Sequence, residues 1–179
     1  TANVASSVYY GLYALQHRGQ ASSGIVVNDD GVFHVYKDSG LVNEVFTPNV
    51  LNALGLGQMA LGNVRYGTSG TKDRLNAEPM LVNHVKGRMA ISHDGALVNY
   101  AELRKELELE GAIFHTSNDV EVIAYMITKA RLTEPSIEAA VCKAMERLKG
   151  GYSMLVMSPQ KLIAARDQNG VHPLCYGIR

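Results

Sequence analysis

Residues 88–99, with the sequence RMAISHDGALVN, mark the point where the chain passes from β-strands to helices. The apolar run over residues 88–93 predicts a strand, and Asp94-Gly95 predicts a turn at its end. Asn99 is typical of a helix N-cap, and Glu102 stands where a capping-box partner belongs. The stretch therefore predicts polar side chains at the end of a buried strand, immediately before a helical block.

Strand patterns dominate the chain before residue 88, apart from one helix near its start. Apolar residues at helical spacing predict that helix over residues 3–16. Two β-rich runs, 25–27 and 32–36, flank Asn28-Asp29-Asp30-Gly31, which is a strong signal for a hairpin. A further strand is expected over residues 61–65, ahead of a turn-rich stretch.

Helical patterns follow residue 99, and a second hairpin comes after them. Three residues that favour N-caps predict where the helices begin: Asn99, Asn118 and Ser136. Glu121 is a capping-box partner for the second of these helices. Apolar runs over residues 152–157 and 162–165 predict the hairpin. Strands and helices thus come in blocks, which favours a single α+β domain with mostly antiparallel sheets.

Length and composition exclude several classes of protein. The chain has 179 residues, enough for one domain, and its 17 Lys and Arg balance 17 Asp and Glu, so no basic field attracts nucleic acid. No apolar stretch approaches the ~20 residues of a membrane-spanning helix, and no secretory signal opens the sequence. Two cysteines are too few for a disulfide-built fold. We therefore expect a cytoplasmic protein that binds neither nucleic acid nor membranes.

Common cofactor and hydrolase motifs do not occur in the sequence. Gly55, Gly57 and Gly62 miss the G-x-G-x-x-G spacing of dinucleotide-binding loops, because the third glycine comes too late. The six histidines show no metal-ligand spacing, and neither a phosphate-binding loop nor a G-x-S-x-G elbow is found. We expect no metal site in this chain.

Polar residues gather instead where apolar strands end and a helix begins. Arg65 closes one expected strand, Asp94-Gly95 follows another, and Asp119 comes directly after an N-cap position. Loop positions on a rigid scaffold are where binding and catalysis concentrate. Each residue taken alone is more simply explained as a cap, a turn or a surface ion pair, because these residue types favour turns.

Six short blocks form a pattern that none of them carries alone: residues 15–20 (LQHRGQ), 40–42 (GLV), 62–66 (GNVRY), 93–99 (HDGALVN), 116–121 (TSNDVE) and 166–174 (RDQNGVHPL). Together they resemble the N-terminal glutaminase domain of the amidophosphoribosyltransferase family, and they keep its order along the chain. The Gln-His-Arg-Gly-Gln block separates this family from the related asparagine and glucosamine-phosphate synthases. The resemblance covers residues 1–179 as one glutamine amidotransferase domain, without the phosphoribosyltransferase domain.

This resemblance implies a fold and a reaction. Family members have the N-terminal nucleophile hydrolase fold, a four-layer αββα sandwich in which two antiparallel sheets lie between helical layers. They hydrolyse glutamine to glutamate and ammonia. The ammonia passes to a second domain, where it converts phosphoribosyl pyrophosphate to phosphoribosylamine in the first step of purine synthesis. The resemblance implies no cofactor in the glutaminase domain, magnesium for the absent phosphoribosyltransferase domain, and a homo-oligomer.

The family's nucleophile has no counterpart in this sequence. In the family it is the thiol of an N-terminal cysteine, whose own α-amino group serves as the base. Alignment of the blocks places that cysteine roughly eight residues before Thr1, so we expect a chain that lacks the first strand of the fold. Cys142 lies on an apolar helix stripe and Cys175 lies near the C-terminal end, and we expect both to be packing residues.

Substrate-binding residues of the family match four positions. Arg65 matches the arginine that holds the glutamine α-carboxylate through paired charge-assisted hydrogen bonds. Asp119 matches the carboxylate that binds the α-ammonium group, and Thr68 matches a nearby contact. Arg18 matches an arginine near the nucleophile, with a structural salt bridge as the alternative. Because a free amino acid is a zwitterion, we expect Arg65 and Asp119 to hold its two ends.

The oxyanion hole is where the sequence departs from the family. Family members have Asn-Gly there, and both residues donate to the tetrahedral intermediate, whereas this chain has Asp94-Gly95, followed by Ala96 where Asn is common. An ionised Asp donates no hydrogen bond, and loss of one such donor typically costs about 100- to 1,000-fold in rate. With the cysteine supplied, we expect Asp94→Asn to turn over glutamine faster, and equal rates would contradict this.

Two functions from different classes stay open at this point. The chain is either the ammonia-producing domain of a purine-pathway transferase or a catalytically inactive glutaminase-like module that binds an amino acid or a partner chain. Arg65, Thr68 and Asp119 favour the first function. Asp94 and the missing cysteine favour the second. Glutamine titration by calorimetry separates either one from a purely structural role.

Overall fold

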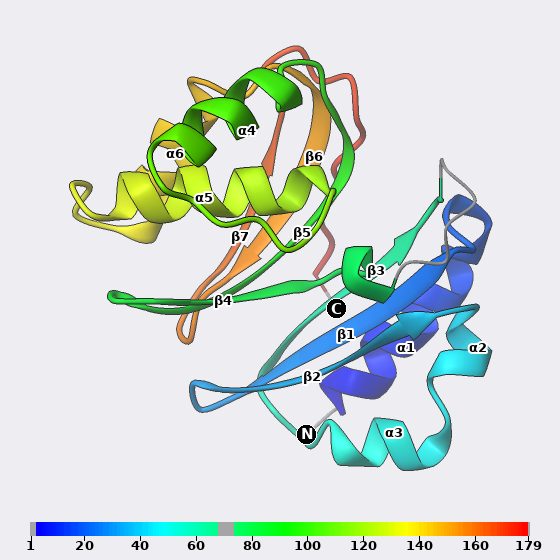
Figure 1. Cartoon of the computed structure of the whole chain (residues 1–179). Coiled ribbons are helices and arrows are strands. Elements are labelled where there is room, and N and C mark those ends of the chain that lie inside the picture. The colour runs from blue at the N-terminus through cyan, green and yellow to red at the C-terminus, as the bar shows by residue number, and fades with distance from the viewer. Residues whose placement is uncertain (1–2, 68–73, 179) are drawn as a thin grey trace.

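The chain folds into two antiparallel sheets with helices beside each of them (Figure 1). The computed structural model describes residues 3–67 and 74–178. Its helices are α1 (Val4–Ala14), α2 (Val42–Val45), α3 (Pro48–Ala53), α4 (Tyr100–Leu109), α5 (Asp119–Arg131) and α6 (Ile137–Met145), with 3-10 turns η1 (Gln16–Arg18) and η2 (Arg74–Asn76). Its strands are β1 (Ser22–Asp29), β2 (Val32–Ser39), β3 (Met59–Arg65), β4 (Met80–His84), β5 (Gly87–Leu97), β6 (Gly150–Met157) and β7 (Leu162–Arg166). The α+β block order expected from the sequence is confirmed.

The first sheet has the strand order β2-β1-β3, with β1 in the middle. The predicted hairpin is confirmed, and its two strands are longer than expected, pairing from Ser22 with Ser39 to Asp29 with Val32. Asp30 and Gly31 make the turn with φ values of 50° and 88°, a left-handed conformation that Asp tolerates and Gly favours. Strand β3 pairs along the other side of β1, so that Arg65 ends the sheet opposite Ser22.

The second sheet has the order β4-β5-β6-β7, and it corrects one prediction from the sequence. Asp94-Gly95 is not a turn, because β5 continues through it and pairs Asp94 with Ser153 and Gly95 with Tyr152. Gly95 has a φ of 131°, and a Cβ placed on it would lie 2.2 Å from the carbonyl oxygen of Gly151. Glycine therefore serves here for close strand contact within the sheet, not for chain reversal.

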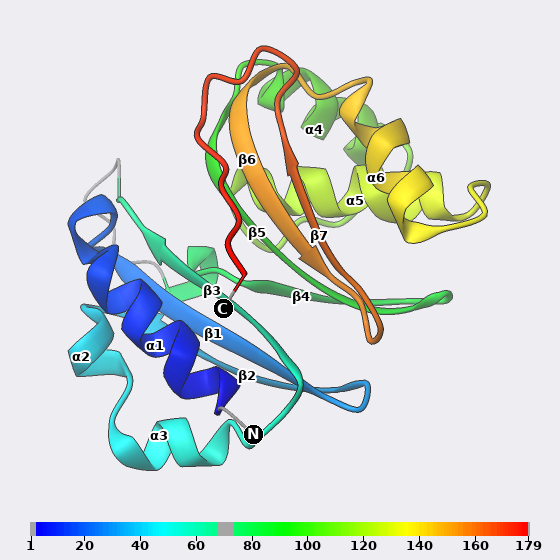
Figure 2. The same ribbon diagram turned by 180° about the vertical axis from the view of Figure 1, so that it is seen from behind.

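Three apolar clusters hold the elements together, and one of them joins the two sheets. The two opposite views show the sheets next to one another, with helices beside each sheet (Figures 1 and 2). Helices α1 and α2 pack on the first sheet through a cluster that includes Leu12 and Ile25. Helices α4, α5 and α6 pack on the second sheet through a larger cluster that includes Ile123. The third cluster contains Val26 of the first sheet and Met157 of the second. Each sheet thus has apolar contacts with helices, and the two sheets contact one another.

Two of the three expected N-caps are confirmed. The Asn118 side chain accepts from the backbone N–H of Val120, and the Ser136 side chain caps α6. Asn99 forms no cap, because its side chain instead donates to the carbonyl of Arg147 and accepts from the N–H of Lys149. The Asn99 side chain therefore links the start of α4 to the segment before β6.

The capping box expected at the start of α5 is not formed. The Glu121 carboxylate turns away from the Asn118 N–H and accepts from the backbone N–H groups of His115 and Thr116. The Asn118 N–H donates to the Thr116 hydroxyl. Side-chain hydrogen bonds thus tie the segment before α5 to the first turn of the helix.

Membrane-spanning helices are not found in the part of the chain that the structure describes, since none of its helices has the necessary length and apolarity.

Candidate functional site

A pocket of about 330 Å³ lies where the ends of β3 and β5 meet the N-terminus of α5. It brings together four of the residues singled out in the sequence, namely Arg65, Asp94, Gly95 and Asp119. Arg18 reaches the same place through an ion pair with Asp94. Thr68 lies outside the described residues. The structure therefore brings the polar ends of separate elements to one pocket at the described positions.

Arg65 supplies a positive charge to this pocket from the end of β3. Its backbone is held on β1 by the pairing with Ser22, and its carbonyl accepts from the N–H of Ala21 at 2.9 Å. Its side chain is half-buried and has neither a hydrogen bond nor an ion pair with any other described residue. The guanidinium fork is thus available for a bidentate anionic ligand such as a carboxylate.

Asp119 supplies a negative charge to the same pocket from the start of α5. It is the first residue of α5, where the helix dipole favours an anion. The backbone N–H of Leu97 donates to its Oδ2 at 2.7 Å, which ties the helix start to the end of β5. A carboxylate has about four acceptor sites, so Asp119 can accept further hydrogen bonds from a cationic group in the pocket.

An exposed cluster surrounds Asp94 at the rim of the pocket. Arg18 Nη2 lies 2.7 Å from Asp94 Oδ2, and the ring nitrogen Nδ1 of His172 lies 3.3 Å from the same oxygen. The Asp94 side chain is 57% exposed and that of Arg18 is 43% exposed. The salt-bridge alternative for Arg18 is thus what the structure shows. The Asp94 carboxylate pairs with the Arg18 guanidinium, and because it has no N–H group it cannot donate a hydrogen bond to an oxyanion as an asparagine amide would.

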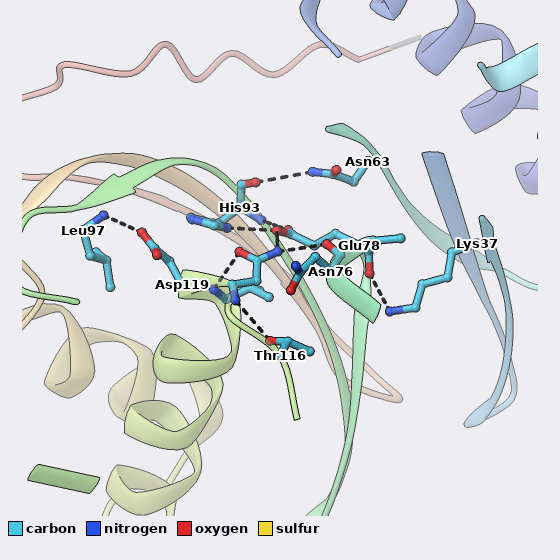
Figure 3. A network of polar contacts seen from close by, with 11 residues as sticks. Lys37, Asn63, Asn76, Glu78, His93, Leu97, Thr116 and Asp119 are labelled. Atoms are coloured by element: carbon cyan, nitrogen blue, oxygen red, sulfur yellow. Dashed lines mark hydrogen bonds and ion pairs between the residues drawn. The ribbon is translucent and has the colours of Figure 1, made fainter. Parts of the chain in front are cut away.

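A buried polar network centred on Glu78 forms part of the pocket lining (Figure 3). Glu78 is 2% exposed, and its Oε2 accepts from the backbone N–H of His93 at 2.7 Å. Its Oε1 lies 3.2 Å from His93 Nδ1 and accepts from the side-chain amide of Asn118 at 2.8 Å. Glu78 gave no functional signal in the sequence, because a glutamate before a proline is typical of an exposed loop.

This network changes the titration of His93. Burial lowers the pKa of this imidazole, but the Glu78 carboxylate, together with the carboxylates of Asp119 and Asp94, outweighs burial, so the pKa of His93 is raised above its ordinary value of 6.5. A protonated His93 would offset part of the negative charge that three carboxylates bring to this region.

Two buried polar atoms beside the pocket have no hydrogen-bond partner among the described residues. They are Oδ1 of Asn63 and Nε2 of His93, and both residues contribute to the pocket lining. The amide nitrogen of Asn63 donates to the backbone carbonyl of His93 at 3.3 Å, which leaves its oxygen free. Buried polar atoms are usually paired, so the region around β3 and β5 has hydrogen-bonding capacity that these residues do not use.

Neither cysteine belongs to the pocket. Cys142 on α6 and Cys175 near the C-terminus are absent from its lining, and both are exposed. The expectation that they are packing residues is wrong, because α6 buries Ala140, Val141 and Ala144 and turns Cys142 outward. Thr1 lies outside the described residues. Within those residues the pocket therefore has recognition groups but no thiol.

Comparison with protein families finds one that matches most of the chain. A family model described as a glutamine amidotransferase domain matches residues 68–179. The amidophosphoribosyltransferase of Methanocaldococcus jannaschii is 45% identical over 175 residues, which cover 98% of this chain and 37% of that protein.

Two solved structures have a closely similar fold. The structure titled "allosteric regulatory enzyme of purine biosynthesis" matches with a TM-score of 0.89 and 38% identity, covering 94% of this chain and 36% of its own. Glutamine phosphoribosylpyrophosphate amidotransferase from Bacillus subtilis, solved with ADP and GMP, matches with a TM-score of 0.86 at the same identity and coverage. The chain thus spans little more than a third of the length of these relatives. It belongs to the glutamine amidotransferase domain family.

Proposed function

We propose that the chain is the glutaminase domain of an amidophosphoribosyltransferase and that its pocket binds glutamine. One observation carries this proposal: Arg65 and Asp119, which have opposite charges and come from different elements, line the same pocket. A free amino acid presents a carboxylate and an ammonium group on one carbon atom. The available guanidinium of Arg65 and the carboxylate of Asp119 match these two groups, and the family membership of the chain supports glutamine as the amino acid.

The orientation of glutamine follows from these two charges. Arg65 binds the α-carboxylate through its fork, and Asp119 accepts from the α-ammonium group. The side-chain amide of glutamine then extends toward the remaining lining, which includes Asp94 and Gly95. In the proposed reaction a thiol attacks this amide carbon, ammonia leaves, and water hydrolyses the resulting thioester to glutamate. The resemblance places the cysteine that carries this thiol ahead of Thr1.

The whole protein would use the ammonia in a second domain. Its relatives are nearly three times as long as the matched region, which leaves room for the phosphoribosyltransferase that the resemblance implies. There ammonia would convert phosphoribosyl pyrophosphate to phosphoribosylamine, in the first step of purine synthesis. The magnesium that the resemblance implies would belong to that second domain.

The finer architecture is part of the same proposal. The two facing sheets, with helices packed on each, support a four-layer sandwich of the N-terminal nucleophile hydrolase type. The first strand of that fold would carry the cysteine. A homo-oligomeric state is proposed on the resemblance alone.

The exposed Asp94 favours a second candidate function. Because Asp94 pairs with Arg18 and cannot donate as an amide would, the pocket could bind glutamine without stabilising the oxyanion. The chain would then be an amino-acid-binding module without activity. Release of ammonia from glutamine, measured after the cysteine has been supplied ahead of Thr1, separates this module from the enzyme.

Calorimetric titration with L-glutamine tests the shared part of both candidates. Arg65→Gln and Asp119→Asn should each weaken glutamine binding by about 10- to 100-fold, the equivalent of one charged hydrogen-bond pair. Arg88→Gln is the matched control, because Arg88 is an exposed arginine on β5 outside this pocket. Equal affinity in all four proteins would overturn the proposal.

A further inference from the structure

Glu78 occupies an unusual place for a carboxylate. It lies between η2 and β4 with 2% of its surface exposed, and no cation of Lys or Arg forms an ion pair with it among the described residues. Burying a carboxylate is costly unless hydrogen bonds compensate. Three donors provide that compensation, namely the backbone N–H of His93, its imidazole and the side-chain amide of Asn118.

Those donors belong to the two segments that build the pocket. His93 immediately precedes the Asp94-Gly95 pair on β5, and Asn118 immediately precedes Asp119 at the start of α5. The carboxylate therefore joins the two segments to one another. The 2.7 Å hydrogen bond from Leu97 N–H to Asp119 joins the same two segments a second time, further along β5 (Figure 3).

Other contacts fix Glu78 and Asn118 in this arrangement. The Asn118 amide also donates to the carbonyl of Asn76 at 3.0 Å, and its oxygen accepts from Val120 N–H, so its orientation is determined on both sides. Lys37 of β2 donates to the carbonyl of Ala77, directly before Glu78, at 2.5 Å. The segment that carries Glu78 is thus anchored to the first sheet as well as to α5.

We propose that Glu78 is the positioning residue of this pocket, setting the end of β5 and the start of α5 at the separation that glutamine requires. The proposal rests on the function proposed above and deepens it. Glu78 lines the pocket, but its carboxylate oxygens are engaged by His93 and Asn118, so its role is to position those residues and not to bind the substrate. It acts through His93 and Asn118, and through them on the residue that follows each, Asp94 and Asp119.

The charges around His93 support this role. Glu78 faces its imidazole from the segment before β4, Asp94 from β5 itself and Asp119 from α5. Attraction between the protonated ring and these carboxylates raises the pKa of His93 despite its burial. The contact between His93 and Glu78 is therefore strongest while the imidazole is protonated.

Glu78→Gln tests the proposal with almost no change in shape. All three partners of the carboxylate are donors, and a carboxamide has only one oxygen to accept from them. We expect faster hydrogen exchange at the Leu97 amide, by at least about tenfold, and a lowered His93 pKa in an NMR titration. Neither measurement requires a ligand.

Glu121→Gln is the matched control, since Glu121 is a buried glutamate in the first turn of α5. Its contacts are with His115 and Thr116, which do not line the pocket. We expect this variant to lose stability while its His93 pKa and Leu97 exchange stay near the wild-type values. Wild-type values in Glu78→Gln, or equal changes in the two variants, would overturn the proposal.

Two further measurements keep the outcome decisive. If Glu78→Gln does not fold, the wild-type protein is titrated with acid instead. The NMR shifts of the Leu97 and Asp119 amides should then follow the titration of His93, and shifts that do not follow it overturn the proposal.

Glutamine affinity is measured alongside, and Glu78→Gln should weaken it more than Glu121→Gln. Absence of glutamine binding in the wild type would defeat the proposed function, while the NMR results still decide whether Glu78 positions the pocket.

Discussion

Two consecutive residues of β5, His93 and Asp94, belong to two very different polar clusters. The His93 side chain is 5% exposed and contacts Glu78, whereas the Asp94 side chain is 57% exposed and contacts Arg18 and His172. Successive side chains of a strand point to opposite faces, so one cluster lies inside the protein and the other at its rim. Similar charged contacts therefore have different consequences: the buried one determines local structure, and the exposed one is screened by solvent.

The largest expected effect comes from removing the buried carboxylate. Glu78→Ala leaves three buried donors without an acceptor, and breaking a buried pair in this way typically costs about 3–5 kcal/mol in the free energy of unfolding. Urea denaturation with circular dichroism measures it. Asp94→Ala is the comparison, with an expected loss below about 1 kcal/mol. Equal losses in the two variants would remove the distinction between the clusters.

The stability of the protein should also depend on the protonation of His93. Because the folded-state pKa is raised, its contribution is fully present below the ordinary value of 6.5 and is lost as pH rises through the folded pKa. Each unit of the shift corresponds to about 1.4 kcal/mol. Unfolding followed between about pH 6 and 8.5 should therefore show declining stability in the wild type. The decline should be smaller in Glu78→Gln, and an identical pH profile in that variant would argue against the pairing.

A smaller effect is expected at the rim. A double-mutant cycle of Arg18→Gln and Asp94→Asn should give a coupling energy below about 1 kcal/mol. Added salt should reduce it further, because both side chains are exposed. A coupling above that limit that persists in salt would show that the rim cluster is as structural as the buried one.

The smallest effect is expected at the exposed pair of Lys161 and Glu138, neither of which lines the pocket. The hydrogen bond from Lys161 holds the pKa of Glu138 at about 2. Lys161→Gln should raise the pKa of this carboxyl toward its ordinary value in an NMR titration, without a measurable change in the urea midpoint. A clear drop in that midpoint would show that exposed pairs stabilise this fold more than the comparison allows.

Sequence patterns anticipated the long, regular elements of this fold. Helix α1 and both hairpins show clear hydrophobic spacing or turn chemistry. Helices α2 and α3 were missed because elements of 4 and 6 residues are too short to display a helical period. The continuation of β5 through Gly95 was missed because an Asp-Gly pair usually marks a turn, whereas here Gly95 lies within the sheet in close contact with the carbonyl of Gly151.

The charged residues of the pocket were predictable, but its internal support was not. Arg65 and Asp119 were found through a resemblance that spans the whole chain, and the structure places them on one pocket. Glu78 gave no signal, because its role depends on donors 15 and 40 residues away in the sequence. Local patterns show which residues can bind a ligand, whereas tertiary structure decides which buried residues hold them in place.

Titration of the wild-type chain with L-glutamine and two truncated analogues tests the central claim most directly. One analogue lacks the α-amino group and the other lacks the α-carboxylate, so each removes the partner of Asp119 or Arg65. We predict that glutamine binds and that both analogues bind at least about tenfold more weakly. Analogues that bind as tightly as glutamine, or no binding of glutamine at all, would contradict a pocket that holds both ends of a free amino acid.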